Sequence, residues 1–134
     1  MNDGTQTWTC PLPTSSADGE VISLAQGDGG AQSRRLIQQH VARILGNDIL
    51  CRFEDAARLP ALAGEIAFTT DSFVVSPLFF PGGDIGKLAV FGTVNDLVVS
   101  GARPRWLSLS LIIEEGLPTE VLRRVLESTA VAAK

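Results

Sequence analysis

The chain has 134 residues, a formal net charge of −4, 45% hydrophobic residues and 19% charged residues. This length allows one domain with a real core, and the composition excludes a disordered chain. Without a basic stripe, nucleic acid is not expected to be the main partner, although one anionic small molecule held by a metal ion is compatible with an acidic chain. No apolar run is long enough to cross a membrane, so no membrane association is expected.

The chain divides into a short leader and one domain. Residues 1–20 are rich in Thr, Ser, Pro, Asp and Gly and predict a loose leader without the features of a signal peptide. One domain is expected over residues 21–134. It opens with the β-branched run at 21–25, which predicts a short strand, followed by the turn residues QGDGG.

A helix is predicted over residues 31–45, because apolar side chains recur there at helical spacing. The segment 46–63 has mixed character and contains Pro60, so it predicts a loop with a short turn. The apolar face of the helix consists of Ile37, Val41, Ile44 and Leu45.

The middle of the chain predicts strand and then helix. Residues 64–80 read as one or two strands interrupted near Asp71, and the PGGD turn follows them. Asp84 occupies the N-cap position of a helix expected over residues 85–100, and Gly101 occupies the position that ends it.

The last part predicts one strand and one helix. Residues 105–113 alternate, with leucines on a face expected to meet the helices and Trp and Ser on the other, which we expect to pack on another chain or domain. A final amphipathic helix opens at Thr119 and is expected to be still running at Lys134, as in a fragment of a longer protein. Together these elements predict an α+β fold, a mixed sheet with helices on one face.

Two carboxylates are the candidates for chemistry. Asp96 is the only charge between Leu88 and Gly101, on a helix whose apolar surroundings predict burial, and a buried carboxylate needs a partner or a metal ion. Asp71 ends a predicted strand, with a turn-forming role as the alternative. With Asn95 beside Asp96, they predict a Mg²⁺ site; the alternative for Asp96 is structural pairing with backbone amides or a nearby arginine.

Weaker candidates lie in the glycine loop and at the start of the second helix. Gly27, Gly29 and Gly30 precede the first helix, so their amides could hold an anion, although a simple turn is the alternative. Lys87 is a candidate phosphate contact or a surface lysine.

The cysteines and the histidine suggest no catalytic role. Cys10 and Cys51 are far apart without further metal-type ligands, and they are expected to be reduced thiols in a cytoplasmic protein. His40, the only histidine, lies in a predicted helix without triad partners and is interpreted as structural.

Longer motifs resemble a known family. The stretches SPLFFPGGDIGKLA and EEGLP, with a strand ending in Asp71 and a helix carrying NDL and then GA.P, closely resemble the N-terminal domain of the HypE family of hydrogenase maturation proteins. That family belongs to the superfamily of aminoimidazole ribonucleotide synthetase (PurM), selenophosphate synthetase and thiamine-monophosphate kinase. The resemblance covers roughly residues 23–134.

The resemblance implies a fold, an activity and partners. The fold would be the PurM N-terminal type, whose mixed sheet pairs across a homodimer into a β-barrel. HypE-like proteins are carbamoyl dehydratases, which use ATP and Mg²⁺ to convert a carbamoyl group on their own C-terminal cysteine into thiocyanate, the source of cyanide for nickel–iron hydrogenase. The carbamoyltransferase HypF supplies the group, and the HypC–HypD scaffold complex accepts the cyanide. Asp71 and Asp96 match two of the acidic positions through which the family binds Mg²⁺ and the phosphates, and Asn95 accompanies Asp96.

The sequence also departs from the family pattern. Gln26 stands where the family usually has His, and Asp28 adds a negative charge to the loop where phosphates would approach. The chain ends before the reactive cysteine, so this polypeptide alone is expected to be inactive. Two alternatives stay open: another ATP-dependent member of the superfamily, such as a thiamine-monophosphate kinase-like protein, and a non-catalytic dimerisation domain.

Overall fold

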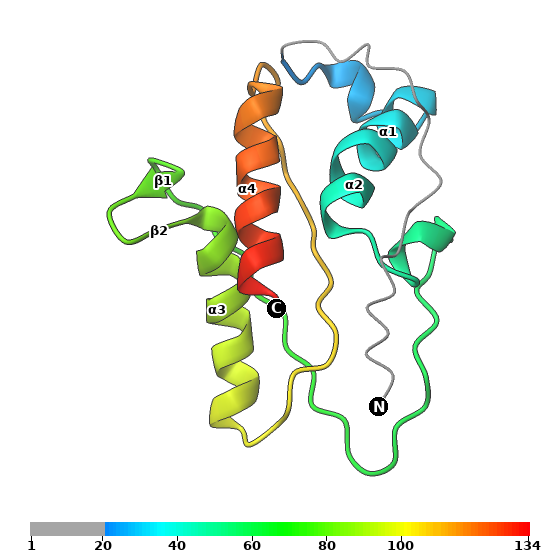
Figure 1. The fold of residues 1–134 in the computed structure, drawn as a ribbon, viewed down its shortest axis with the longest axis vertical. Helices are drawn as coiled ribbons and strands as arrows, with labels where there is room; N and C mark the ends of the chain where they lie inside the picture. Colours follow the sequence, from blue (N-terminus) through cyan, green and yellow to red (C-terminus); the bar gives the residue numbers. More distant parts are fainter. Residues whose placement is uncertain (1–20) are drawn as a thin grey trace, which may run out of the picture.

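The computed structural model describes residues 21–134, so the predicted leader at 1–20 lies outside the described residues. Two long helices, α3 and α4, lie side by side, and the shorter α1 and α2 lie on the other side of the extended segment that follows α3 (Figure 1). The helical elements are η1 (Leu24–Gln26), α1 (Ala31–Leu36), η2 (Ile37–Val41), α2 (Ala42–Leu45), η3 (Leu50–Arg52), α3 (Ile85–Val99) and α4 (Thr119–Ala132), and the strands are β1 (Phe79–Phe80) and β2 (Gly83–Asp84).

The first predicted helix is confirmed. Elements α1, η2 and α2 form one continuous helical stretch over residues 31–45, in which η2 is a π-helical turn. The stretch ends at Gly46. Only glycine fits at this position, because a Cβ there would lie 2.2 Å from the carbonyl oxygen of Ala42. The loop expected over residues 46–63 is also found, with η3 as its short turn.

The boundaries of the two long helices follow the predicted signals. The Asp84 side chain caps α3 by accepting hydrogen bonds from the amides of Gly86 (2.8 Å) and Lys87 (3.1 Å). Gly101, at φ +79°, follows α3 in the left-handed conformation that glycine adopts without steric cost. Helix α4 begins at Thr119 as predicted but ends at Ala132, so the expectation that it runs to Lys134 is wrong; the last residues of a helix lack intrahelical partners.

The core lies between the α1–α2 stretch and α4. Its buried centre consists of Ile22, Leu122 and Leu126, and the partly buried side chains packed on it are Leu36, Val41, Ile44, Leu45, Ile113 and Leu117. The amide of Ile22 donates to the carbonyl of Leu117 at 2.8 Å, which joins the start of the described chain to the start of α4. This core holds the helices together and leaves much of α3 outside it.

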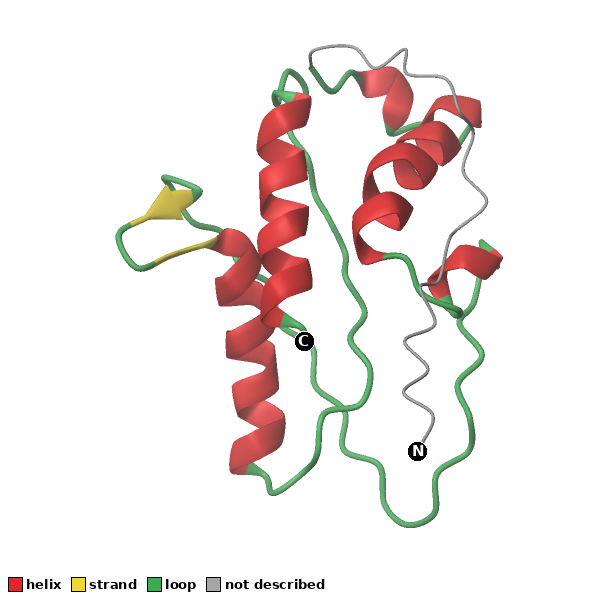
Figure 2. Ribbon diagram, in the orientation of Figure 1, coloured by secondary structure: helices red, strands yellow, loops and turns green. Residues whose placement is uncertain are grey.

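The predicted strands are mostly absent as hydrogen-bonded strands. Within residues 21–134 the sheet structure is one antiparallel pair, β1–β2, shown in yellow in Figure 2, with an isolated bridge between Val21 and Pro118. The predicted strand at 21–25 is wrong, because η1 replaces it after Val21. Of the predicted strands at 64–80, only Phe79–Phe80 forms, and residues 105–113 have no ladder partner.

Unpaired backbone explains this difference. A strand needs a neighbouring strand to satisfy its N–H and C=O groups, and the described chain offers none to these two segments. Their apolar side chains are correspondingly exposed: Phe68 is 83% exposed, and Val74 and Ile112 are completely exposed. The mixture of helices with a small sheet is found, whereas the larger mixed sheet is not formed in this part of the chain.

Part of the apolar face predicted for residues 105–113 turns toward the helices. Leu109, Leu111 and Ile113 line an apolar cavity of about 440 Å³ together with Leu36 and Leu122. Leu109 and Leu111 are nevertheless 37% exposed, close to the 38% of Trp106 on the opposite face, and Ile112 on that face is completely exposed. No helix over residues 21–134 combines the length and the apolar character needed to span a bilayer.

Candidate functional site

Helix α3 carries Asn95 and Asp96 near its C-terminal end, and both side chains are exposed. The expectation that Asp96 is buried is therefore wrong. Helix α3 is apolar on several sides but contacts α4 along one side only, so residues such as Val98 and Val99 are exposed as well. An exposed carboxylate is available to a ligand without the cost of a buried charge.

A second segment reaches the same helix. The hydroxyl of Thr69 donates a hydrogen bond of 3.5 Å to Oδ2 of Asp96. Four residues further on, the ring of Phe73 lies against Gly92, where a Cβ would be only 2.6 Å from Cζ of the ring. Asp71 lies between Thr69 and Phe73 in sequence and is exposed. The structure thus brings the segment that carries Asp71 onto the helix that carries Asp96.

The candidate side chains suit a hard cation that takes its remaining ligands from a substrate and from water. The carboxylates of Asp71 and Asp96 and the amide of Asn95 contain oxygen atoms, the ligands that hard cations prefer. Within the described residues no group of three or more His, Cys, Asp and Glu side chains comes together as a metal site. Mg²⁺ commonly uses one or two protein carboxylates and takes its other ligands from water and phosphates. These residues therefore fit Mg²⁺ bound with a phosphate ligand, rather than a metal enclosed by protein.

The glycine loop uses its amides internally. The amide of Gly27 donates to the carbonyl of Leu24 at 2.9 Å, and that of Gly29 donates to the hydroxyl of Ser33 at 2.9 Å. The amide of Gly30 donates to Oδ1 of Asp28 at 2.7 Å. A phosphate that reached the last of these amides would have to displace a carboxylate.

Lys87 lies in the first turn of α3 and is half-buried. Its charge acts on Asp84, which is buried at the N-terminus of the same helix. Burial raises the pKa of Asp84, but hydrogen bonds from Ser128 and from the amides of Lys87 and Gly86, together with the Lys87 charge, lower it below its ordinary value. Asp84 is thus a stably ionised structural carboxylate.

The structure corrects the prediction for one of the two cysteines. Cys51 is buried in η3 and is disulfide-bonded, so the expectation of a reduced thiol is wrong for this residue. Cys10 lies outside the described residues. The prediction rested on the redox state of the compartment, whereas a disulfide also depends on the distance between two sulfurs, which spacing in sequence does not determine. His40 is buried within η2.

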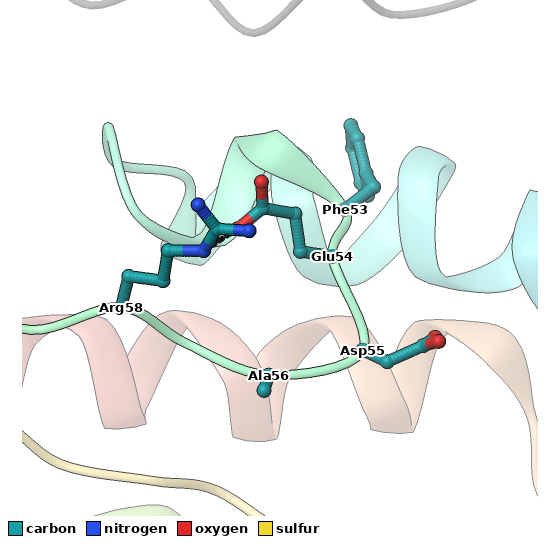
Figure 3. A pocket seen from close by; sticks show the side chains of 5 residues that line it. All are labelled: Phe53, Glu54, Asp55, Ala56 and Arg58. Carbon is teal, nitrogen blue, oxygen red and sulfur yellow. Dashed lines mark ion pairs between the residues drawn. The ribbon is translucent and has the colours of Figure 1, made fainter.

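A separate pocket of about 420 Å³ lies beside η3, lined by Phe53, Glu54, Asp55, Ala56 and Arg58 (Figure 3). The Arg58 guanidinium and the Glu54 carboxylate form an exposed ion pair at 3.6 Å, and the Asp55 side chain points away from it. Exposed pairs of this kind contribute little. None of the residues predicted to bind a ligand lies in this pocket.

Sequence reasoning missed three residues at the candidate site: Thr69, Phe73 and Gly92. The signal for one of them was present, because a glycine inside a predicted helix costs about 1 kcal/mol relative to alanine and often marks a close approach. Thr69 and Phe73 carried no such signal, since only the folded chain shows which segment crosses α3.

The family follows from comparison with known proteins. Residues 53–134 match the family described as AIR synthase related protein, N-terminal domain. The chain belongs to this family. The α3–α4 pair and the candidate site on α3 lie inside the matched region.

The curated relatives agree with the resemblance predicted from the motifs. The chain is 49% identical over 118 residues to carbamoyl dehydratase HypE of Escherichia coli, covering 84% of this chain and 35% of the relative. It is 46% identical over 113 residues to the HypE of Azotobacter vinelandii, covering 84% of this chain and 33% of the relative. The chain thus spans about a third of the length of the curated relatives it matches.

A solved structure gives the same result. The crystal structure of hydrogenase maturation protein HypE in complex with ATP superposes with a TM-score of 0.80 and is 53% identical in sequence. The match covers 84% of this chain and 33% of that chain. The fold predicted from the resemblance is therefore confirmed as HypE-like over most of the chain.

Proposed function

We propose that residues 21–134 form the ATP- and Mg²⁺-binding N-terminal domain of a HypE-type hydrogenase maturation protein that acts in the cytoplasm. The observation that carries the proposal is the contact of Thr69 with Asp96, which joins the segment of Asp71 to the helix of Asn95 and Asp96. The similarity to a HypE structure solved with ATP supports the choice of nucleotide.

In the proposed site, Asp71 and Asp96 hold Mg²⁺ and Asn95 contributes an amide oxygen. Bound Mg²⁺ offsets the negative charge of the phosphates. Lys87 is a secondary contact to a phosphate, and the amides of Gly27, Gly29 and Gly30 are the weakest candidates because they donate within their own loop. Both carboxylates are exposed, so they meet a ligand from solvent.

The complete protein would dehydrate a carbamoyl group on a C-terminal cysteine. The amide oxygen is a poor leaving group; transfer of the γ-phosphoryl group of ATP to it makes phosphate the leaving group. Loss of phosphate and of the two amide protons leaves a thiocyanate on the sulfur, which supplies the cyanide ligand of the hydrogenase iron. Domain 21–134 contributes the nucleotide site to this reaction and does not complete it alone.

We further propose a homodimer, with HypF as carbamoyl donor and the HypC–HypD complex as cyanide acceptor. The homodimer is supported by the two extended segments, residues 64–76 and 105–113, most of whose apolar side chains are exposed and whose backbones lack ladder partners within the described chain. A second copy offers strands that would pair with them and form the barrel. The two partner proteins rest on the family similarity alone.

Calorimetry on the full-length protein tests the nucleotide site. We expect Asp96→Asn and Asp71→Asn to weaken binding of ATP in the presence of Mg²⁺ at least about tenfold, since each removes a charged ligand. Asp55→Asn, a carboxylate at the other pocket, is the matched control and should bind as the unchanged protein does. Unchanged binding by Asp96→Asn would contradict the metal-ligand assignment, and no binding of ATP by the unchanged protein would favour a non-catalytic dimerisation domain.

A second measurement separates the proposed activity from that of a thiamine-monophosphate kinase-like protein. The full-length protein, carbamoylated on its C-terminal cysteine, is incubated with ATP and Mg²⁺ and analysed by mass spectrometry. We expect the cysteine adduct to lose the mass of one water. Phosphorylation of added thiamine monophosphate, without that loss, would support the kinase-like alternative.

A further inference from the structure

A glycine in the middle of α3 marks a close approach of two segments. Gly92 lies at the eighth position of α3, where glycine costs about 1 kcal/mol relative to alanine. A Cβ at this position would lie 2.6 Å from Cζ and 2.9 Å from Cε1 of Phe73, closer than real Cβ contacts come. The half-buried ring of Phe73 therefore occupies the space that a side chain at residue 92 would fill.

A second contact lies one helical turn further along α3. Asp96 is four residues after Gly92, so both residues lie on the same side of the helix. There Oδ2 of Asp96 accepts the hydrogen bond from the hydroxyl of Thr69. The two contacts attach both ends of residues 69–73 to one side of α3, with Asp71 in the middle of the attached stretch.

Backbone hydrogen bonds within the described chain do not hold this stretch in place. Residues 69–73 make no backbone hydrogen bond with another described residue, since they have no ladder partner. Within one chain, their position on α3 consequently depends on the side chains of Thr69 and Phe73. A small change in either contact would shift Asp71, and displacements of about 1 Å at a reacting site can cost about a hundredfold.

We propose that Gly92, Phe73 and Thr69 are positioning residues that hold Asp71 at a set place relative to Asp96. This inference rests on the proposed function, in which the two carboxylates share one Mg²⁺. The three residues act through the carboxylates: the ring and the glycine set how closely residues 69–73 approach α3, and the Thr69 hydroxyl orients the Asp96 carboxylate.

The first test is Gly92→Ala in the full-length protein, with binding of ATP measured by calorimetry. Alanine favours the helix, so any loss arises from the displaced ring. We expect binding of ATP with Mg²⁺ to weaken at least about fivefold, while binding of ATP in excess EDTA stays within about twofold, because only the metal-dependent part uses both carboxylates. An equal loss under both conditions would overturn the inference.

A matched pair at Thr69 tests the hydroxyl. Thr69→Val keeps the shape and removes the donor, whereas Thr69→Ser keeps the donor. We expect Thr69→Val to weaken Mg²⁺-dependent binding by about threefold or more and Thr69→Ser to restore it, because only serine keeps a hydroxyl that can donate to the carboxylate. Equal binding by the two variants would exclude the hydroxyl from this role.

Hydrogen exchange gives a readout that needs no ligand. In the nucleotide-free dimer, where residues 69–73 are proposed to pair with the second copy, we expect Gly92→Ala to speed amide exchange over residues 69–73, while Ile22→Val, a mild core substitution, leaves both this exchange and the metal dependence unchanged. Unchanged exchange in Gly92→Ala would overturn the proposed attachment.

The outcomes also separate this inference from the proposed function. If Asp96→Asn weakens Mg²⁺-dependent binding but Gly92→Ala and Thr69→Val do not, the positioning role fails and the metal site stands. If Asp96→Asn binds normally, the metal site itself fails, and the positioning role fails with it.

Discussion

Ser128 on α4 donates a hydrogen bond of 2.6 Å to Oδ2 of Asp84, the residue that caps α3. The other carboxylate oxygen, Oδ1, accepts from the amides of Gly86 and Lys87. Both oxygens of a buried carboxylate thus have partners, and one side chain connects the end of the β1–β2 pair, the start of α3 and the side of α4.

Loss of this link should destabilise the protein. We expect Ser128→Ala to lower the free energy of unfolding by about 1–3 kcal/mol, because it leaves one oxygen of a buried charge without its donor. Urea unfolding of the full-length protein followed by circular dichroism measures this value. Ser100→Ala is the control, since its hydroxyl makes only an exposed bond to the carbonyl of Leu97, and its effect should stay within about 0.5 kcal/mol. Equal effects of the two substitutions would contradict the role of Ser128.

The same carboxylate predicts a dependence of stability on pH. The pKa of Asp84 in the folded protein is below its ordinary value of 3.8, so the folded state binds this proton less readily than the unfolded state does. Its contribution to stability is therefore complete above about pH 3.8 and is lost as the pH falls through the lower folded value.

Asp84→Asn isolates this contribution, because asparagine also caps helices well. We expect the difference in unfolding free energy between the unchanged protein and Asp84→Asn to be constant above about pH 5 and to shrink as the pH falls below 3.8. Urea titrations at a series of pH values give this difference. A difference that does not vary with pH would contradict the lowered pKa.

The crossing of the two long helices depends on Gly86. A Cβ there would lie 2.6 Å from the carbonyl oxygen of Val125 and 2.7 Å from Oγ1 of Thr129. We expect Gly86→Ala to destabilise the protein by about 1–3 kcal/mol, despite the better helix propensity of alanine, because α3 and α4 must move apart. Thermal unfolding measures the effect. Val99→Ala, an exposed site on the same helix, should change stability by less than about 0.5 kcal/mol.

The exposed face of residues 105–113 predicts how a charged substitution there affects dimerisation. Ile112 is completely exposed in the single chain, so Ile112→Asp should leave the fold of one chain intact. If residues 105–113 pair with a second copy, the buried charge should weaken dimerisation at least about tenfold. Sedimentation of the full-length protein measures this, with Val131→Asp on α4 as the control. An unchanged dimer would place the interface elsewhere.

Local signals determined the helices. The N-cap at Asp84, the left-handed Gly101 and the opening of α4 at Thr119 were all predicted correctly, because capping and helix termination depend on neighbours within a few residues. The error at the end of α4 and the π-helical turn in η2 are small departures within correctly predicted helices.

Strands depend on distant partners, and here the sequence was less informative. Alternation over residues 105–113 correctly indicated that Leu109, Leu111 and Ile113 turn toward the helices. It did not indicate whether a neighbouring backbone would be present, and within the described chain none is. Disulfide formation at Cys51 was mispredicted for a related reason, since it depends on a distance between sulfurs that spacing does not set.

The sequence by itself identified the candidate residues for the proposed chemistry: Asp71, Asn95 and Asp96 stand out by charge and motif. Only the tertiary structure decided that Asp96 is exposed, and that Thr69 and Phe73 attach the segment of Asp71 to α3. The physical reason is that residue type is a local property, whereas exposure and contact depend on how segments distant in sequence pack.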